Sequence, residues 1–226
     1  MVVVAIWLMS VALLAPNNLA AQEKSDSEQQ KTEPKLPNIS KELKERVARD
    51  QKAREAMIKS MQQNASGGFK IDSGIMNELT AIDKENTAWL EKQIETHGWL
   101  GKTLVGKSGA HDAWLLVQHA DLNLNFQKKC LDLMSKMPTG EVSPVDIAYL
   151  TDRVLSAEGK PQRYGTQCET VDGKAKVKNV EDPENLNKRR AELGLEPIEE
   201  YLKRIEALYG SQSKAENKKV NEESDK

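Results

Sequence analysis

Apolar residues recur along residues 108–137 at the spacing of an amphipathic helix. At about 100° per residue, several of them fall in one narrow stripe, and further apolar side chains lie outside that stripe. A helix that is apolar on most sides is covered by its neighbours, so we expect one central buried helix over 108–137. Polar side chains on such a helix need partners, which makes them candidates for a structural network or a site. They are Gln118, His119, Asp121, Asn123 and Asn125.

Shorter patterns on either side predict further helices and one hairpin. Capping and breaking residues favour helices over 40–63 with Ser40 as N-cap, over 75–96, over 143–159 with Ser143 as N-cap, over 182–194 and over 197–208. Alternating residues around Asp172-Gly173 predict a β-hairpin over about 166–180, because Asp-Gly suits a type I′ turn. We therefore expect a mostly α, multi-helix domain around the central helix, with one β-hairpin.

The two ends of the chain differ from its middle in composition. Residues 1–21 carry no charged side chain, and their apolar run is shorter than the roughly 20 residues that span a bilayer, which predicts a signal peptide. Residues 22–38 and 211–226 are polar with little to bury, which predicts a disordered linker and a disordered tail. A single domain is expected over 39–210 of an exported protein, periplasmic or extracellular. No Cys follows the apolar run, so the sequence does not favour a lipid anchor.

The balance of charges narrows the range of partners. Lys and Arg number 33 and Asp and Glu 35, for a formal net charge of −2. This balance lacks the basic excess that nucleic-acid-binding domains carry, and we expect no nucleic-acid partner. We also expect no stable membrane insertion once the signal segment is cleaved, and we predict no cofactor. The ligand is expected to be a small molecule or a peptide, and the oligomeric state stays open.

Residues 101–108 match the G-x-x-x-x-G-K-[ST] pattern of a phosphate-binding P-loop. A P-loop follows a buried strand of a parallel sheet, whereas a predicted helix precedes this match and the chain has no β-α alternation. We therefore interpret the segment as a connection between helices, with Ser108 as the N-cap of the next one.

Five short motifs together carry a resemblance to a known family. They are HGW at 97–99, AWLLVQHAD at 113–121, YLTDR at 149–153, PQRYGTQ at 161–167 and RAELGL at 190–195. In this order they resemble a bacterial family of exported or lipid-anchored proteins that is catalogued as a domain of unknown function. The resemblance covers about 83–201 and implies no activity. It implies signature positions at Gln118, His119, Asp121, Asp152, Arg153, Gln162, Tyr164, Gly165, Thr166 and Gln167.

Helical geometry divides the polar residues of the central helix into two groups. On a continuous helix, His119 and Asp121 point about 200° apart, so they cannot enter one pocket from the same side. We prefer the flank of Gln118 and Asp121 as the ligand-binding side, with a polar pocket between it and the 162–167 segment. The predicted ligand-binding residues are Gln118, Asp121, Arg153, Gln162, Tyr164 and Gln167.

Arg153 and His119 each have a specific chemical role to consider. Arg153 either pairs with Asp121 or receives an anionic ligand, because a guanidinium forks onto a carboxylate. His119 is the candidate general base, oriented by Asp112 or Asp152, and its alternative is a hydrogen-bonded core histidine.

The remaining metal-binding and redox candidates are few. The three histidines His97, His111 and His119 lack the spacing that places two metal ligands on one helix face, so no metal site is predicted. Export would permit a disulfide between Cys130 and Cys168, the two cysteines of the chain, and the sequence leaves this possible bridge open. Three functions stay in view, with a binding module preferred over a hydrolase or transferase and over a structural or protein-interaction domain.

Overall fold

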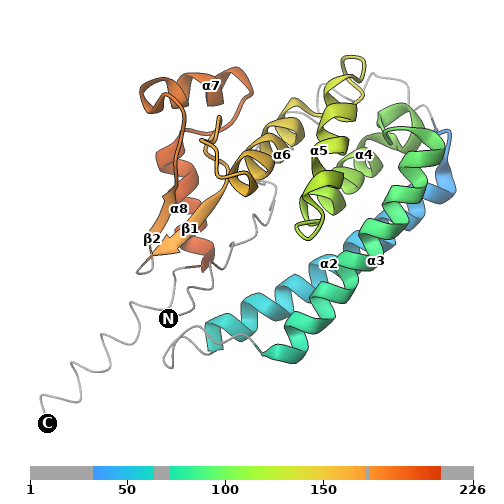
Figure 1. Ribbon diagram of the computed structural model, residues 1–226, viewed down its shortest axis with the longest axis horizontal. Helices are drawn as coiled ribbons and strands as arrows, with labels where there is room; N and C mark the ends of the chain where they lie inside the picture. Colours follow the sequence, from blue (N-terminus) through green and yellow to red (C-terminus); the bar gives the residue numbers. More distant parts are fainter. Residues whose placement is uncertain (1–32, 64–71, 172–173, 210–226) are drawn as a thin grey trace, which may run out of the picture.

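Two long antiparallel helices form one side of the molecule (Figure 1). The computed structural model describes residues 33–63, 72–171 and 174–209. Helix α2 (Pro37–Gln63) and helix α3 (Ser73–His97) confirm the first two predicted helices. Helix α2 begins earlier than expected, so Ser40 is not its N-cap; its Oγ donates instead to the carbonyl of Val105, at 2.8 Å. That hydrogen bond ties the start of α2 to helix α4 (Lys102–Gln118).

Helix α4 (Lys102–Gln118) contains the P-loop-like match. Gly106 has φ 78° and ψ 169°, a conformation that favours glycine, and it kinks the helix there. The helix begins at Lys102, and the kink comes two residues before Ser108, so the prediction of Ser108 as N-cap is wrong. Helix α3, not a strand, precedes the match, and the described strands both follow it. The segment is the kinked start of α4 and not the connection between helices that we expected, and it has no P-loop architecture.

The predicted single helix over 108–137 is two helices. Helix α4 ends at Gln118, and helix α5 (Leu124–Ser135) begins after Asn123, whose side chain accepts a hydrogen bond from the Phe126 N–H at 3.1 Å. The residues between them, 119–123, form a turn. No Gly or Pro marks this turn, and apolar residues continue through it, so periodicity alone did not locate the break.

Helix α4 is nevertheless the centre of the helical part. It packs against α2, α3, α5 and helix α6 (Pro144–Ala157). Its residues 113–117 are all buried, and they contribute to the largest hydrophobic cluster. Helix α6 begins as predicted, because the Ser143 side chain accepts a hydrogen bond from the N–H of Asp146 and Pro144 opens the first turn. The mostly α fold class is confirmed.

The C-terminal part adds the predicted hairpin and two helices (Figure 1). Strands β1 (Cys168–Val171) and β2 (Lys174–Val177) pair antiparallel, and the Asp-Gly turn at 172–173 lies outside the described residues. A short 3-10 turn, η3 (Pro183–Asn185), leads into α7 (Leu186–Glu192), and helix α8 (Ile198–Tyr209) follows. Helix α8 packs on β2 through a separate hydrophobic cluster that includes Tyr201 and Ile205.

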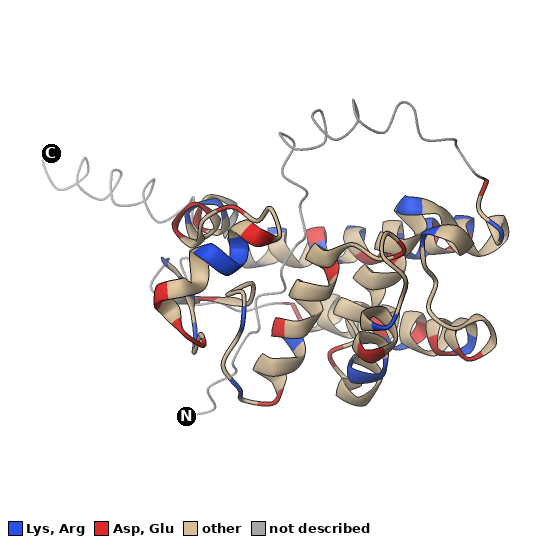
Figure 2. Cartoon of the chain, turned by 90° about the horizontal axis from the view of Figure 1, so that it is seen from above, with Lys and Arg blue, Asp and Glu red and all other residues tan. Residues whose placement is uncertain are grey.

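The expected signal peptide at 1–21 and the tail at 211–226 lie outside the described residues. The expected linker at 22–38 reaches into them, and its last residues are part of the fold: the Leu36 N–H donates to the carbonyl of Leu104 at 2.8 Å, and α2 begins at Pro37. Among the described helices, none combines the length and the apolar character needed to cross a membrane. Basic and acidic residues are interspersed along the helices (Figure 2).

Candidate active site

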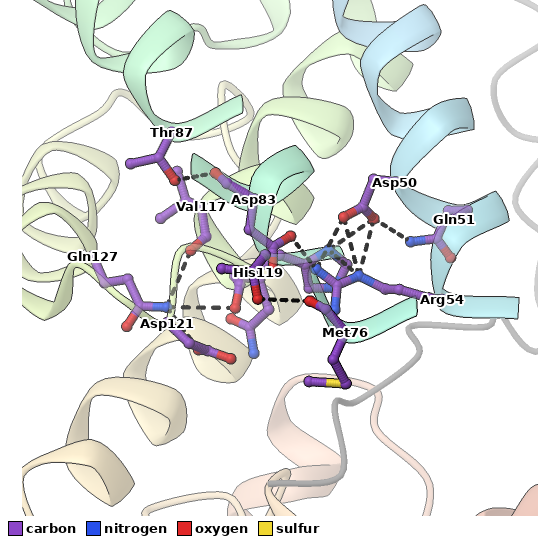
Figure 3. A network of polar contacts seen from close by, with 12 residues as sticks. Asp50, Gln51, Arg54, Met76, Asp83, Thr87, Val117, His119, Asp121 and Gln127 are labelled. Atoms are coloured by element: carbon purple, nitrogen blue, oxygen red, sulfur yellow. Dashed lines mark hydrogen bonds and ion pairs between the residues drawn. The ribbon is translucent and has the colours of Figure 1, made fainter. Parts of the chain in front are cut away.

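A buried ion pair on α2 forms the base of the candidate site (Figure 3). Asp50 and Arg54 lie one helical turn apart, and both side chains are at most 1% exposed. Arg54 Nε lies 3.0 Å from Asp50 Oδ1, and Nη2 lies 2.9 Å from the same oxygen. Nη2 also donates to Oδ1 of Asp83 on α3, at 2.6 Å. One guanidinium therefore joins carboxyl groups on α2 and α3.

His119 is the first residue beyond α4, and its imidazole contacts the same ion pair (Figure 3). Its Nδ1 lies 2.9 Å from Asp50 Oδ2 and 3.0 Å from Arg54 Nε. Arg54 Nε–H points to Nδ1 but can also donate to both oxygens of Asp50, whereas Nδ1 and Asp50 Oδ2 need a hydrogen between them. We therefore assign the ring hydrogen to Nδ1, from which it is donated to Asp50. The ring is 2% exposed, and its Nε2 has no hydrogen-bond partner in the described chain. Asp50 thus orients an imidazole whose second nitrogen keeps a lone pair.

The surroundings shift the pKa values of His119, Asp50 and Asp83 in different directions. Burial and the charge of Arg54 lower the pKa of His119, so its ring is neutral at pH 7. Burial raises the pKa of Asp50, but the interactions with His119 and Arg54 outweigh burial and hold it well below its usual range. Burial, together with the nearby charges of Asp50 and Asp121, outweighs Arg54 at Asp83 and raises its pKa to about 7.

The turn at 119–123 brings Asp121 to the same group, which corrects the prediction of two separate flanks. That prediction assumed a continuous helix, whereas the helical geometry ends before His119. Oδ1 of Asp121 accepts a hydrogen bond from Gln127 Nε2 at 3.2 Å, and Oδ2 lies 3.6 Å from Arg153 Nη1. The pairing of Asp121 with Arg153 is therefore confirmed, and both residues belong to the His119 side of the molecule.

Several buried polar atoms around His119 lack a partner within the described residues. They are Nε2 and Oε1 of Gln118, Nε2 of His119, and Nε and Nη2 of Arg153. Gln118 is fully buried and Arg153 is 2% exposed. Unpaired buried polar atoms are costly, and a concentration of them in neighbouring residues calls for a bound water or ligand.

Asp152, which we expected as a possible partner of His119, has a different role. Its carboxylate accepts hydrogen bonds from the backbone N–H groups of Arg163, at 2.7 Å, of Tyr164, at 3.1 Å, and of Thr166, at 2.9 Å. The prediction that Asp152 orients the imidazole is wrong, because this carboxylate holds the 162–167 segment onto α6 and Asp50 orients the ring. Asp112, the other expected partner, is likewise replaced by Asp50.

The two glutamines of the 162–167 segment use their amides inside the segment and its neighbours. Gln162 Nε2 donates to the carbonyls of Gln167, at 2.9 Å, and Lys178, at 3.0 Å, and its Oε1 accepts from the Gln167 N–H at 2.8 Å. Gln167 Nε2 donates to Thr166 Oγ1 at 2.9 Å. Tyr164 is half-buried. The predicted ligand-binding residues thus fall into two groups: Gln162 with Gln167, and Gln118 with Asp121 and Arg153. Because the amides of Gln162 and Gln167 already have partners, ligand binding by these two glutamines stays a prediction.

The other histidines and the cysteines lie elsewhere. His111 pairs with Asp146, with its Nδ1 3.1 Å from both carboxylate oxygens, and His97 is the last residue of α3. The described residues contain no cluster of three or more His, Cys, Asp and Glu that could hold a metal ion. Cys130 lies in the main core and Cys168 beside the α8 cluster, and both are free thiols, so the possible bridge is not formed.

A surface groove of about 490 Å³ runs along α2 and is separate from the His119 group. Its charged side chains pair with one another, as Arg49 does with Glu85 at 2.6 Å. The groove is lined by Asn38, Lys41, Glu42, Glu45, Arg46, Arg49 and Glu85.

Comparison with known proteins places the chain in a family. A family model described as a family of unknown function, DUF6624, matches residues 37–214. The chain belongs to DUF6624. No curated protein and no solved structure matches the chain. The DUF6624 match begins at Pro37, and therefore includes α2 with the Asp50–Arg54 pair, well before the stretch on which the sequence resemblance rested.

Sequence reasoning missed Asp50, Arg54 and Asp83 of this DUF6624 domain. A local signal exists for the first two. The buried stripe of α2 passes through Leu43 and Met57, and positions 50 and 54 fall on that stripe at helical spacing. Charged residues on a buried helical stripe indicate a buried ion pair, and this pattern could have directed attention to α2.

Proposed function

We propose that this DUF6624 domain is an enzyme in which His119 acts as a general base. The observation that carries the proposal is the 2.9 Å contact between Asp50 Oδ2 and His119 Nδ1, which leaves Nε2 as a buried, unpartnered acceptor. A general base must be unprotonated at the working pH, and burial together with the charge of Arg54 lowers the pKa of His119.

The reaction class that suits these groups is hydrolysis or group transfer. Nε2 of His119 accepts the proton of an attacking water or substrate hydroxyl as its oxygen bonds to the electrophilic atom. The imidazolium then gives that proton to the leaving group as its bond breaks, so the ring returns to its neutral form. Asp50 is a positioning residue: it holds the tautomer and stabilises the imidazolium while it exists.

Asp83 and Arg54 set the charge around the base. Because the pKa of Asp83 is raised to about 7, Asp83 carries a proton for part of the time at neutral pH, whereas Asp50 remains ionised. Carboxyl groups with pKa values pushed apart around one cation are a common arrangement in acid–base sites.

The test compares wild type with His119→Gln and Asp50→Asn on a panel of chromogenic esters, amides, phosphates and glycosides, and on a metabolite extract followed by mass spectrometry. The expected result is a conversion by wild type that His119→Gln slows by about 100-fold or more. Asp132→Asn, on the exposed face of α5, is the control, since its ion pair with Lys136 is 60% to 70% exposed. Equal conversion by His119→Gln overturns the proposal, as does a wild type that converts nothing while His119→Gln loses stability.

A binding module without chemistry is the second candidate, and one observation favours it. The amide of fully buried Gln118 and two nitrogens of Arg153 have no partner among the described residues, and a site for a small molecule or peptide is built around a few polar groups of this kind. A ligand that co-purifies with the protein and survives incubation unchanged would favour this candidate. We further propose export of the chain, which the uncharged apolar composition of residues 1–21 supports.

A further inference from the structure

Arg153 presents an unused edge of its guanidinium inside the protein. The side chain lies on α6 and is 2% exposed. Its Nη1 points to Asp121, with 3.6 Å between Nη1 and Oδ2. Nε and Nη2 have no hydrogen-bond partner among the described residues. The interaction with Asp121 therefore occupies one corner of the group and leaves the opposite edge free.

The geometry of that edge selects a ligand type. The N–H bonds of Nε and Nη2 lie in one plane and run nearly parallel, so they match the two oxygens of a single carboxylate in a bidentate contact. A lysine ammonium, which is a point charge, cannot reproduce this contact. A buried guanidinium with two unpaired donors is costly unless an acceptor satisfies them.

Contacts link the Arg153–Asp121 pair to the end of α4 and to His119. Gln127 Nε2 donates both to Asp121 Oδ1, at 3.2 Å, and to the backbone carbonyl of Gln118, at 3.4 Å, so it holds the end of α4 beside the Asp121–Arg153 pair. The charge of Arg153 is close enough to His119 to contribute to the lowering of its pKa. Gln118 and His119, at the end of α4, therefore belong to the same group of residues as Arg153, and the amide of Gln118 and Nε2 of His119 have no partner among the described residues.

We propose that Arg153 binds a carboxylate of the substrate side-on through Nε and Nη2, and that Gln118 and His119 contact an N–H or hydroxyl next to that carboxylate. The contact with His119 rests on the proposed function, in which the imidazolium gives its proton to the leaving-group nitrogen or oxygen. The substrate class is a small carboxylate with a neighbouring proton donor, such as an N-acylated amino acid or the C-terminal end of a peptide.

The charge of the site favours a carboxylate over a phosphate. Arg54 and Arg153 supply two positive charges, and Asp50 and Asp121 balance them with two negative ones. Asp83, whose pKa is raised to about 7, adds no charge when it is protonated, so a bound carboxylate leaves one negative charge in the group. A phosphate dianion would leave a second, uncompensated charge in a buried position, which is costly.

The test titrates the full chain with N-acetylglycine, with its uncharged methyl ester, and with inorganic phosphate. The signal is the Nε–H resonance of Arg153 in arginine-labelled protein, assigned by its loss in Arg153→Lys. N-acetylglycine is expected to shift this resonance saturably, and the methyl ester is not. Arg153→Lys is expected to weaken N-acetylglycine binding by about tenfold or more, as measured by calorimetry, because it keeps the charge and loses the bidentate edge. Arg49→Lys, at an exposed ion pair on α2, is the matched control and is expected to bind as wild type does.

Melting temperatures without ligand show whether each variant is folded, and Arg153→Gln serves as a second variant if Arg153→Lys is not. Equal binding by wild type and a folded Arg153 variant overturns the proposal. So does equal binding of the methyl ester, or tighter binding of phosphate at the same resonance.

The outcomes separate this inference from the proposed function. Binding of N-acetylglycine that depends on Arg153, together with conversion that is indifferent to His119→Gln, supports the carboxylate site and removes the general base. Conversion that depends on His119 but uses only substrates without a carboxylate supports the general base and removes the carboxylate site.

Discussion

Asp50 and Asp83 share one guanidinium, that of Arg54, yet their carboxyl pKa values move in opposite directions. Asp50 receives Nε and Nη2 of Arg54 together with the Nδ1 hydrogen of His119, whereas Asp83 receives Nη2 alone, at 2.6 Å. Burial and the negative charges of Asp50 and Asp121 outweigh Arg54 at Asp83 and raise its pKa. The protonated member is therefore Asp83, and the ionised member is the one that orients the histidine.

The raised pKa of Asp83 makes part of the stability depend on pH. The folded state holds a proton up to pH of about 7 that the unfolded state releases near 3.8, so the contribution is complete below pH 3.8 and is lost as the pH rises through 7. Asp83→Asn is uncharged at every pH and lacks this loss. The free energy of unfolding of wild type minus that of Asp83→Asn is expected to fall by up to about 4 kcal/mol between pH 4 and 8.

Urea unfolding at several pH values, followed by circular dichroism, measures this difference. The contributions of the other titrating groups are common to both proteins and cancel to a first approximation. Asp132→Asn, with a 60% exposed side chain, is expected to give a flat difference over the same range. A flat difference for Asp83→Asn as well would show that the Asp83 pKa is ordinary.

His119 is expected to be neutral at pH 7, with its hydrogen on Nδ1. Nitrogen NMR of histidine-labelled protein reports both properties, and His119→Gln assigns the signal among the three histidines. The pKa of His119 should lie below 6.5, so stability falls as the pH drops below 6.5, where the unfolded chain takes up a proton that the folded one does not. His111 is the internal contrast: burial lowers its pKa, but the contact with Asp146 outweighs burial and raises it. An Nε2–H tautomer of His119 would contradict the assignment.

Asp50→Asn is expected to destabilise the fold by about 3–5 kcal/mol, because it removes the ionised partner of the buried Arg54 guanidinium. The pKa of Asp83 should fall at the same time, since the neighbouring negative charge is gone. Urea unfolding at pH 7 measures the first effect, and carbon NMR of the aspartate carboxyl groups measures the second. The control is again Asp132→Asn, which removes an exposed pair of the same four-residue spacing and is expected to cost under about 1 kcal/mol. Similar losses for the two variants would refute the special role of the buried pair.

Cys130 and Cys168 are expected to remain unreactive thiols in the folded protein. Burial raises the pKa of both thiols to about 12, so almost no thiolate is present at pH 8. Iodoacetamide should therefore label neither in native buffer and both after unfolding in urea. Non-reducing peptide mass mapping completes the measurement, and a linked pair of peptides containing the two residues would contradict the prediction.

Local signals explain which parts of the fold could be predicted. The start of α6 was predictable because Ser143 and Pro144 mark it within two adjacent residues. The break between α4 and α5 was not, because its one capping side chain, that of Asn123, stands inside an apolar pattern that continues on both sides. Because the predicted helix continued through His119, it placed the side chain of Asp121 on the side opposite to His119, whereas the turn brings both residues to the same group.

The candidate site likewise contains some residues that could be predicted from the sequence and others that could not. His119, Asp121 and Arg153 could be singled out from the sequence, and the ion pair of the last two was expected. Asp50 could not be assigned to His119, because 69 positions separate them along the chain and only the packing of α2 on α4 brings them together. Long-range contacts of this kind leave no spacing rule in the sequence.

Helix α6 connects the histidine group with the segment that leads into the C-terminal hairpin. Its neighbouring residues Asp152 and Arg153 point to different structures: Asp152 holds the backbone at Arg163, Tyr164 and Thr166, and Arg153 faces the histidine group. A turn of α6 about its own axis moves both side chains together. Occupancy of the guanidinium is therefore expected to change amide exchange at Arg163, Tyr164 and Thr166, so these amides can report on the centre of the molecule.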